Sequence, residues 1–435
     1  MLNILSSWIN LDVLNIISII VMSLFPILYL TQNIFAIIAL FAKAKKFHKT
    51  EELHHFGYLI CAHNEEEVIG NLIESIYKQN YHKELMDVFV MCDNCTDKTL
   101  EIAKALGCHI IERNDEHLIG KCYALDYAFK EILANYNDLG IELFCIFDAD
   151  NLLNKDYTLE MNKVYAAGYE VATGFRNSKN FQKNWLTSGA GFTFFRECEI
   201  IHKARVLCNI GTYVSGTGFY VSKKVLETLN GWPFDSLIED IEFSIYCANN
   251  NIKIGYHKDA IFYDEQPENF NDSFFQRLRW CRGNHQCFVR HWKELIKGIF
   301  KKRNFACYEL LMHTAPIPAI TFIWSIIYIG LVAIYAINNN YSFIQFLDCG
   351  IMAIINYFIA LIGMALFHGL VVIIHDHRRV DCNKFKLIIY WLLFPVFMIV
   401  LLIISVISMF VKVKWKKINH SDCKTIEEIE GDNNE

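Results

Sequence analysis

The chain has 435 residues, more than a usual single domain, and 53% of them are hydrophobic, with a mean hydropathy of +0.22. This composition is too apolar for an ordinary soluble protein and indicates membrane segments. The net charge of −6 and the pI near 6.2 do not suggest nucleic-acid binding. The 15 cysteines are scattered, which is typical of a reducing compartment, and Cys92 and Cys95 form a lone C-x-x-C pair for which we expect no metal or redox role.

The first apolar run covers residues 13 to 42, carries no charge and is followed by Lys43, Lys45 and Lys46. This length suffices for one transmembrane helix, tilted or kinked at Pro26, and is too short for two. We expect no cleavable signal peptide, because the run is too long and no basic region precedes it. Lysines cluster on the cytoplasmic side of membrane helices, so residues 1–46 are predicted to be a transmembrane helix that leads into the cytoplasm.

From about Gly57 the composition becomes that of a soluble α/β domain. Apolar runs predict strands, and the segments between them have helical patterns that begin near Glu65, Thr96 and Leu118. Alternating strands and helices predict a parallel sheet with right-handed crossovers. No G-x-G-x-x-G follows the first strand, which argues against a dinucleotide cofactor. The four expected strands are Tyr58 to Cys61, Val88 to Met91, His109 to Ile111 and Phe144 to Phe147.

Two carboxylates, Asp148 and Asp150, stand one residue apart where the fourth strand gives way to a loop. Alternate residues of an extended chain point to the same side, and open α/β sheets bind ligands at this end of their strands. Two hard anions facing one site suit Mg²⁺ or Mn²⁺. The competing interpretation is a turn with solvated aspartates, so the surrounding motifs decide between the two.

The neighbouring strand ends are also polar. The first strand runs into His63 and Glu65, the second into Asp93, and the third helix opens near Lys121. Carboxylate and imidazole side chains accept hydrogen bonds from a base or a ribose, and an ammonium group can reach a phosphate.

The order of these motifs resembles the nucleotide-sugar half of the family-2 inverting glycosyltransferases with the GT-A fold. Three further segments resemble later motifs of that family: its acceptor-side loop, its T-E-D motif and its Q-x-x-R-W motif. Together with the flanking apolar helices, they resemble the membrane-integrated branch that contains cellulose, chitin, hyaluronan and poly-N-acetylglucosamine synthases. The segments are Ser215 to Phe219, Ile238-Glu239-Asp240 and Gln276-Arg277-Leu278-Arg279-Trp280.

The chain departs from the family pattern at a few positions. Ile238 stands where many relatives have Thr, His63 where Tyr is common, and Cys92 and Asn94 where the second strand often ends in Asp-Asp-Gly. None of these changes removes a charged group from the matched catalytic positions. The contacts to the base and the ribose remain open.

The resemblance implies a role for each matched residue. Asp150 would hold the metal, with Asp148 nearer the ribose or just beyond the direct ligands, and Asp240 would be the general base. The alternative for Asp240 is a solvated acidic helix start. The remaining implied assignments are nucleotide-sugar binding by His63, Glu65, Asp93, Lys121 and Asp148, and pyrophosphate or acceptor binding by Glu239, Gln276, Arg279 and Trp280.

The segment after Tyr263 leaves two questions open. Tyr263 to Pro267 is predicted to be a loop that could cap the nucleotide, without an assigned role. Beyond it, a cluster of arginines with two tryptophans also suits an interfacial helix that meets anionic lipid. Both interpretations can hold, because a product entering the bilayer would be gripped at the membrane surface. The cluster comprises Arg277, Arg279, Arg282, Arg290, Trp280 and Trp292.

Beyond Phe305 the chain is apolar again, with charge-free runs at Leu310 to Leu347, Cys349 to His375 and Leu387 to Val411. Three spanning helices would place the basic segment at residues 412–417 outside. We therefore expect the third run to be a re-entrant or interfacial pair of half-helices broken at Pro395. Trp415-Lys416-Lys417 resembles the cytosolic tail of relatives, and the residues from Glu427 onward are expected to be disordered.

These observations predict four parts: a transmembrane helix (1–46), a GT-A domain of the α/β class (47–300), a membrane region with two to three segments (301–417) and a polar tail (418–435). The resemblance implies a multi-pass plasma-membrane enzyme with its catalytic domain in the cytoplasm. It would transfer a sugar from a nucleotide sugar, most simply UDP-linked, to a growing β-linked polysaccharide, using Mg²⁺ or Mn²⁺ and no nucleic acid. The alternatives are transfer to a membrane lipid and a non-catalytic assembly or transport subunit.

Overall fold

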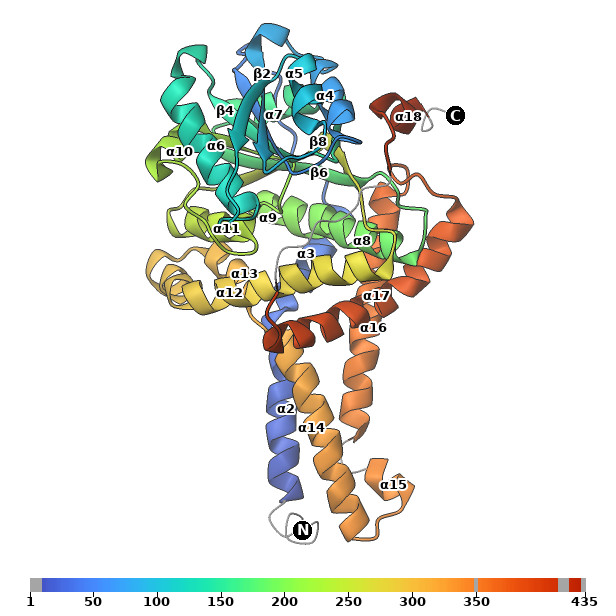
Figure 1. The fold of residues 1–435 in the computed structure, drawn as a ribbon. Helices are drawn as coiled ribbons and strands as arrows, with labels where there is room; N and C mark the ends of the chain where they lie inside the picture. Colours follow the sequence, from blue (N-terminus) through green and yellow to red (C-terminus); the bar gives the residue numbers. More distant parts are fainter. Residues whose placement is uncertain (1–9, 348–350, 414–421, 432–435) are drawn as a thin grey trace.

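The computed structural model describes residues 10–347, 351–413 and 422–431. An α/β domain lies above a stem of apolar helices, and a layer of long helices separates the two (Figure 1). The chain enters through the stem, builds the domain and most of the layer, returns to the stem, and then comes back to the layer and the edge of the sheet.

The described chain forms an eight-stranded sheet in the order β3-β2-β1-β4-β7-β6-β8-β5. The first four strands of this order are mutually parallel, β7 is antiparallel to both of its neighbours, β6 pairs in parallel with β8, and β5 is antiparallel to β8. The strands are β1 (Phe56–Ala62), β2 (Met86–Asp93), β3 (His109–Arg113), β4 (Leu143–Asp148), β5 (Leu152–Leu153), β6 (Val171–Ser178), β7 (Phe219–Ser222) and β8 (Ile254–Asp264).

The four strands expected from the apolar runs are present, each with ends within two residues of the prediction. β1 and β4 are buried on both faces, which is why they have continuous rather than alternating apolar sequences. The helices that follow begin three or four residues later than expected. Turns separate the strands from these helices, and in the first two turns Asn64 and Asn94 have left-handed backbone conformations that Asn tolerates better than most residues.

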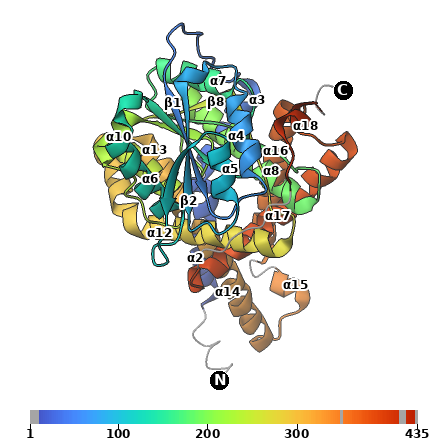
Figure 2. The ribbon, with the colours of Figure 1, turned by 45° about the horizontal axis from the view of Figure 1, so that its top comes forward.

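Helices cover both faces of the sheet (Figure 2). One apolar core lies between the sheet and α4, α5 and α7, and a second lies on the other face beneath α6, α10 and α11. Two 3₁₀ turns, Lys83–Leu85 and Asn137–Leu139, precede β2 and β4. The helix bounds are α4 (Ile69–Tyr77), α5 (Thr99–Ala105), α6 (Lys121–Asn135), α7 (Tyr157–Ala166), α10 (Lys223–Leu229) and α11 (Glu239–Asn249).

The layer below the sheet consists of α8, α9, α12, α13 and α17 (Figure 1). α8 passes through a π-helical segment, Glu197–His202, before α9; π-helical turns are rare and often mark functional sites. The long helix α12 crosses the whole width of the domain and packs along α17. The bounds are α8 (Trp185–Arg196), α9 (Lys203–Leu207), α12 (Phe270–Lys302), α13 (Phe305–Thr314) and α17 (Lys384–Phe410).

The stem contains α2, α14 and α16, whose apolar side chains pack together. Among the described residues, four helical segments are long and apolar enough to cross a membrane: 11–41, 317–338, 357–376 and 384–410. The first of these is interrupted at Tyr29, three residues after Pro26, in agreement with the predicted kink. The remaining bounds are α2 (Leu11–Leu28), α3 (Leu30–Phe41), α14 (Ile317–Asn338), α15 (Phe343–Phe346) and α16 (Met352–Asp376).

The expectation of two half-helices broken at Pro395 is wrong. α17 continues through Pro395 as one helix of 27 residues and runs obliquely over the upper end of the stem (Figure 1). Phe394 and Phe397, on either side of the proline, are almost fully buried in a core shared with α8 and α16. This packing offsets the hydrogen bond that proline removes.

The expectation of a disordered C-terminal tail is also wrong for the residues that the structure describes. Ile426–Gly431 form α18, which rests against the edge of the sheet. Ile426 and Ile429 bury their side chains against Leu152 and Tyr263, and Lys78 forms a 2.8 Å ion pair with Glu427. Two apolar residues one turn apart give this acidic segment a face to bury. Trp415-Lys416-Lys417 lies outside the described residues.

Candidate active site

Lys121 and Asp148 meet at the carboxyl edge of the sheet. Lys121 is the first residue of α6, and its ammonium group bonds to Asp148 Oδ1 and, at 2.7 Å, to the carbonyl oxygen of Gly216. Burial disfavours the charged form of Lys121, but the nearby carboxylates of Asp148 and Glu239 outweigh this and raise its pKa. The ammonium group is therefore fixed as a cation beside the D-x-D turn.

The turn after Asp148 is held by a chain of hydrogen bonds. The Asp148 N–H donates to Thr217 Oγ1 at 3.0 Å, and the Thr217 hydroxyl donates to Asn151 Oδ1. The Asn151 amide donates to Asp150 Oδ1 at 3.3 Å and to Asp264 Oδ1 at 2.8 Å. Asp150 is thereby kept in a buried position next to Asp148.

Arg176 and Asp264 form a buried pair behind this turn. Arg176 donates to Asp264 Oδ2 through Nε at 3.1 Å and Nη2 at 2.8 Å, and through Nη1 to the carbonyl oxygen of Ser215 at 3.2 Å. Such two-point arginine–carboxylate pairing fixes orientation as well as charge. The pair links the D-x-D turn to the loop at residues 215–218.

The sequence interpretation gave no role to Arg176, Asn151, Thr217 or Asp264. Thr217 lies in the segment Ser215 to Phe219 and Asp264 in the segment Tyr263 to Pro267, both of which the sequence had indicated as possible parts of the site. Asn151 directly follows Asp150, but no pattern in the chain pointed to Arg176.

Two further carboxylates, Glu239 and Asp240, open α11 beside the 215–218 loop. A Cβ atom added to Gly216 would lie 3.8 Å from Asp240 Oδ2, and the Gly216 carbonyl oxygen accepts from Lys121. Gly216 is therefore next to both Asp240 and Lys121. Gly216 has a φ of +79°, a conformation that favours glycine. The loop therefore brings Asp148 and Asp240, 92 positions apart in the chain, to one site.

The pKa values of Glu239 and Asp240 are both raised. Burial raises the pKa of Glu239, while Lys121 and Arg279 oppose the shift. Burial, followed by the charge of Glu239, raises the pKa of Asp240 to about 7. A carboxylate with this pKa can accept a proton near neutral pH.

Glu242, two residues after Asp240, is not among the charges that raise the pKa of Asp240. Its carboxylate contacts His291 at 2.9 Å and accepts from the Ser236 N–H at 3.0 Å. Despite burial, these hydrogen bonds hold the pKa of Glu242 at about 2. Glu242 joins α11 to α12 as a structural ion pair.

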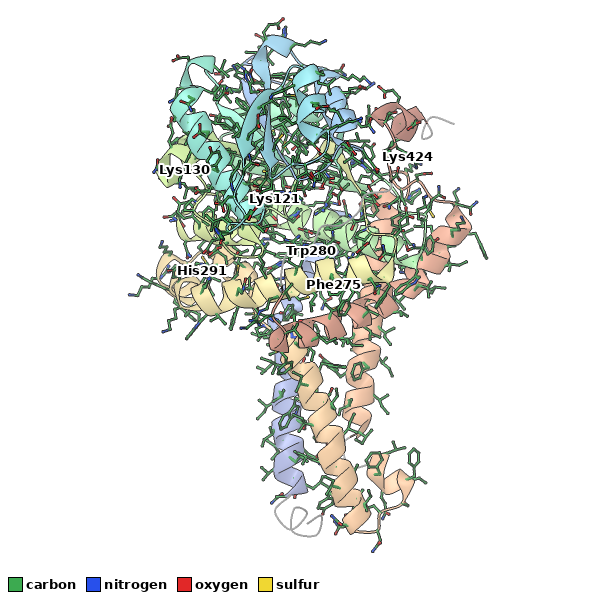
Figure 3. The ribbon with its side chains drawn as sticks, viewed as in Figure 1. Lys121, Lys130, Phe275, Trp280, His291 and Lys424 are labelled. Carbon is green, nitrogen blue, oxygen red and sulfur yellow. The ribbon has the colours of Figure 1, made fainter. Side chains whose placement is uncertain are left out.

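The Q-x-x-R-W segment lies on α12, beneath the acidic pair. Arg279 donates to the carbonyl oxygen of Leu237 at 3.0 Å, just before α11 begins. Trp280 meets Phe194 of α8 edge-to-face, with ring centroids 6.1 Å apart. Gln276 accepts from Arg277 at 3.2 Å. Figure 3 shows Trp280 on α12 below Lys121, at the boundary between the domain and the helical layer.

The lipid-anchoring alternative is not supported for three of the arginines of α12. Arg277 is buried, with its guanidinium 5.0 Å from the ring of Phe397, and Arg279 bonds to Leu237. Arg282 donates to the Ser408 carbonyl oxygen at 3.3 Å and caps the end of α17. Arg277 and Arg282 thus contact α17, which packs along α12, and Arg279 contacts the segment that leads into α11.

The predicted base and ribose ligands lie at the adjacent ends of β1 and β2. The His63 ring donates from Nδ1 to the carbonyl oxygen of Asp93 at 2.7 Å, and burial raises the pKa of Asp93 beside Arg113. The Glu65 N–H bonds to Thr99 at 2.8 Å. β1 lies between β2 and β4, with Cys61 opposite Asp148, so these residues border the same sheet edge as the D-x-D turn.

The donor set around Asp148 and Asp150 fits a metal that is shared with a substrate. Within the described ranges, no three or more His, Cys, Asp or Glu side chains are grouped to hold an ion. Mg²⁺ is commonly bound by one or two carboxylates together with substrate phosphates, so a full protein cage is not required. Asp150 and Asp148 meet this smaller requirement.

The α/β fold and the carboxylates that converge at the sheet edge are those expected for a glycosyltransferase. Comparison with known protein families leads to the same class of enzyme. Residues 54–283 match the family described as "Glycosyltransferase like family 2". The chain belongs to this family and is a glycosyltransferase. The family and enzyme class inferred from the motifs are thereby confirmed.

Curated relatives share modest identity with the chain. "Probable glycosyltransferase YdaM" of Bacillus subtilis is 25% identical over 389 residues, which cover 84% of each chain. The "Beta-monoglucosyldiacylglycerol synthase" of Synechocystis is 24% identical over 271 residues, 60% of this chain and 55% of the relative. The "Poly-beta-1,6-N-acetyl-D-glucosamine synthase" of Staphylococcus aureus is 22% identical over 269 residues, with 60% and 61% coverage. The chain thus aligns with little more than half of these two synthases.

The fold is shared with a solved structure, the mannosyltransferase PcManGT from Pyrobaculum calidifontis in complex with GDP-Man and Mn²⁺. The TM-score is 0.57 at 15% identity, covering 91% of this chain and 99% of the other. This likeness confirms the expected GT-A type of α/β fold. With its apolar helices, the chain is a membrane-associated glycosyltransferase.

Proposed function

We propose that the chain transfers a sugar from a nucleotide sugar, UDP-linked, to a growing β-linked polysaccharide, with inversion at the anomeric carbon. The observation that carries the proposal is the placement of Asp240, with its pKa of about 7, beside Gly216, whose carbonyl oxygen accepts from the Lys121 ammonium group that pairs with Asp148. An inverting transferase needs these two functions on opposite sides of the sugar: a proton acceptor for the attacking hydroxyl and a cationic site for the leaving group.

The donor would bind at the ends of β1, β2 and β4. His63, Glu65 and Asp93 border the space for the base and ribose, and Lys121 presents an ammonium group toward phosphate. Asp150, with Asp148, would hold Mg²⁺ or Mn²⁺; when bound, this ion neutralises the charge that develops on the diphosphate. PcManGT, the structural relative with GDP-Man and Mn²⁺, supports this arrangement.

The acceptor would be activated by Asp240. Its carboxylate takes the proton of the attacking hydroxyl as the new glycosidic bond forms and the bond to the diphosphate breaks. Burial and the charge of Glu239 raise the pKa of Asp240 to about 7, close to a neutral pH, which suits a general base. Glu239 and Arg279 lie next to this group and would orient the diphosphate and acceptor.

The acceptor chain would lie along α12. Trp280 offers an indole face on which a sugar ring can stack, and Gln276 is one helical turn away on the same element. Phe194 holds the indole from one edge. Stacking holds a sugar ring without fixing its rotation about the indole plane. Successive sugar rings of a growing chain can therefore occupy the same position, which suits repeated transfer.

The enzyme is proposed to be a multi-pass protein of the plasma membrane, with the α/β domain in the cytoplasm. Lys43, Lys45 and Lys46 follow the first apolar segment on the side of the domain, as expected for a cytoplasmic flank. α12 and α17 lie between the site and the stem, so the acceptor side adjoins the membrane (Figure 1).

Transfer to a membrane lipid is the second candidate, and one observation favours it. Helix α12, which carries Trp280, packs along the apolar helix α17, so a lipid that enters beside α17 would place its headgroup near α12. The similarity to the β-monoglucosyldiacylglycerol synthases agrees with this alternative. The non-catalytic alternative is not retained, because the chain is a glycosyltransferase with all the matched carboxylates in place.

One experiment tests these candidates. Membranes that contain the full chain are incubated with a set of labelled nucleotide sugars, and the products are separated into polymer, chloroform-soluble glycolipid and free sugar. Label in polymer that disappears with Asp240→Asn supports the leading proposal. Label only in glycolipid replaces it with the second candidate, and no transfer from any donor rejects both.

A further inference from the structure

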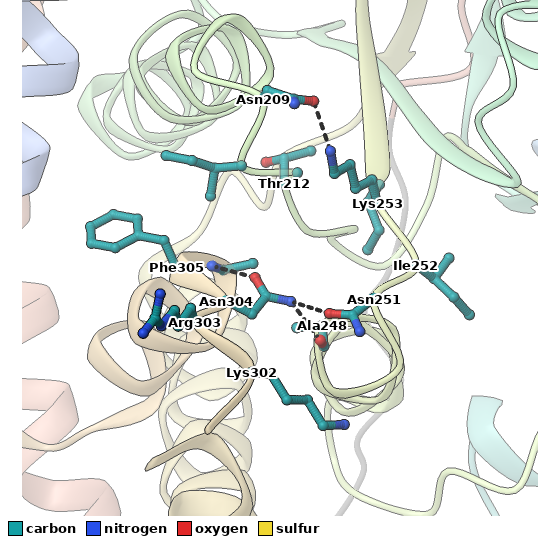
Figure 4. A pocket seen from close by; sticks show the side chains of 14 residues that line it. Asn209, Thr212, Ala248, Asn251, Ile252, Lys253, Lys302, Arg303, Asn304 and Phe305 are labelled. Atoms are coloured by element: carbon teal, nitrogen blue, oxygen red, sulfur yellow. Dashed lines mark hydrogen bonds between the residues drawn. The ribbon is translucent and has the colours of Figure 1, made fainter. Parts of the chain in front are cut away.

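A pocket of about 280 Å³ lies on the underside of the α/β domain, away from the active site. It is formed where the turn between α12 and α13 meets the loop after α9 and the turn between α11 and β8 (Figure 4). The proposed function gives this pocket no role. Its lining includes Asn209, Thr212, Asn251, Lys253, Lys302, Arg303, Asn304 and Phe305.

The charge of the lining has one sign. Lys253, Lys302 and Arg303 contribute three cations, and no carboxylate from the described residues lines the pocket or forms an ion pair with them. Lys253 donates to Asn209 Oδ1 at 3.0 Å and Lys302 donates to the Asn249 carbonyl oxygen, so both bond to neutral oxygens. In a protein of net charge −6, this pocket is locally positive and suits an anion.

Arg303 is held in an unusual conformation. It follows the last residue of α12 with a φ of +51°, a left-handed conformation that usually takes Gly or Asn. Asn304 fixes the turn by donating to the Ala248 carbonyl oxygen at 2.7 Å and accepting from the Ala306 N–H at 3.0 Å. Arg303 lies in this turn, among the residues that line the pocket (Figure 4).

The pocket also adjoins the membrane stem. Phe305, in its wall, stacks on Tyr308 at 5.1 Å between ring centroids, and the Tyr308 hydroxyl donates to the Leu28 carbonyl oxygen at 2.6 Å. Leu28 belongs to the first candidate membrane span. Phe300 and Phe305, on either side of Lys302 and Arg303, are 78% and 42% exposed. Exposed aromatic rings beside cations are the pattern of a membrane interface.

We propose that this pocket binds the phosphate headgroup of an anionic membrane phospholipid, with Lys253, Lys302 and Arg303 contacting the phosphate and Phe300 and Phe305 entering the acyl boundary. The position beside the first membrane span favours a lipid over a soluble phosphate compound. The inference does not depend on the identity of the sugar donor or acceptor.

The test measures lipid retention rather than activity. The full chain is purified in an uncharged detergent and mixed with phosphatidylglycerol, phosphatidylcholine or inorganic phosphate, and bound molecules are counted by native mass spectrometry. We expect retention of phosphatidylglycerol at concentrations where phosphatidylcholine is lost. Each cation near an anionic headgroup contributes about fivefold, so the triple variant Lys253→Gln/Lys302→Gln/Arg303→Gln should weaken retention about a hundredfold.

Matched controls separate this site from general charge. Lys83→Gln/Lys104→Gln/Lys130→Gln removes three cations elsewhere on the domain and should leave retention unchanged. Lys253→Arg/Lys302→Arg/Arg303→Lys keeps the charges and should retain the lipid. If the triple glutamine variant does not fold, Arg303→Gln alone serves, because the Arg303 side chain makes no hydrogen bond or ion pair with other described residues.

Three outcomes overturn the proposal. Equal retention of the two lipids shows that the headgroup charge is not recognised. Loss of phosphatidylglycerol in the control triple variant shows a diffuse charge effect. Displacement of the lipid by equimolar inorganic phosphate assigns the pocket to a soluble phosphate ligand instead.

Discussion

Lys121 and Asp148, 27 residues apart in the chain, form an ion pair at the edge of the sheet, and the same ammonium group bonds to the Gly216 carbonyl oxygen at 2.7 Å. Lys121 therefore links the D-x-D turn to the loop beside Asp240. A donor phosphate bound by Lys121 would therefore lie between the D-x-D turn and this loop.

The role of the D-x-D carboxylates is tested with Asp150→Asn. We expect transfer to fall by about 10²-fold or more, because a metal that neutralises the leaving group contributes several kcal/mol. Transfer is measured with labelled donor, and donor affinity by calorimetry with and without Mn²⁺. Asp138→Asn, an exposed aspartate before β4, is the control. Full activity of the wild type in EDTA would contradict the prediction.

The role of Asp240 is tested with Asp240→Asn. Turnover should fall by about 10²-fold or more, with donor affinity near that of the wild type, because only proton transfer is lost. Asp235→Asn changes an exposed carboxylate five residues earlier and should have little effect. Wild-type turnover in Asp240→Asn would assign this residue to a solvated helix start.

The pH dependence of the wild type provides a separate prediction. Asp240 has a pKa raised to about 7 and must be deprotonated to act, so kcat/KM should rise with pH through about 7 and then level off. The same shift means that its ionisation opposes folding: the contribution to stability is present below its ordinary pKa and lost as pH rises through about 7. Above pH 7, thermal melting should therefore show Asp240→Asn to be no less stable than the wild type. A rate independent of pH between 5.5 and 8 would be inconsistent with this role.

The product class is tested with Trp280→Ala. Losing an aromatic contact costs on the order of 1 kcal/mol, enough to shorten the residence of a glycan chain several-fold. Polymer should become shorter or disappear while first transfer or donor hydrolysis partly persists, as read by gel filtration at matched donor turnover. Trp292→Ala, on the same helix but 39% exposed, should leave polymer length unchanged. If wild-type membranes yield only glycolipid, the lipid acceptor replaces the polymer.

The connection between the domain and the stem is tested with Glu199→Gln. Glu199 is fully buried and pairs with Lys203 and, at 2.5 Å, with Lys258, which in turn contacts Asp376 of α16 at 2.8 Å. Removing one partner of a buried network costs about 3–5 kcal/mol, so thermal inactivation should occur at a clearly lower temperature. Glu112→Gln breaks an exposed pair with Lys104 and should cost less than about 1 kcal/mol. Equal melting of the two variants would show that the buried network adds no stability.

Much of the fold could be predicted from local patterns. β1 and β4 are buried on both faces, so their sequences are continuously apolar, and the long charge-free runs correspond to helices of membrane length. The D-x-D turn could be singled out because of the motifs around it, since two aspartates at a strand end are by themselves also compatible with a solvated turn. Asp240 was placed by its motif, and its separation from Asp148 in the sequence gave no measure of their distance.

The sequence by itself determined the elements, their order and the polar residues at the strand ends, because these depend on side chains that are neighbours along the chain. Only the tertiary structure decided that α17 continues through Pro395, that Ile426 and Ile429 dock α18 on the sheet, and that Arg176 fixes Asp264 behind the D-x-D turn. Each of these features depends on contacts between segments far apart in the chain. Local propensity does not encode such contacts, because their free energy comes from burial and charge pairing that exist only once the segments have met.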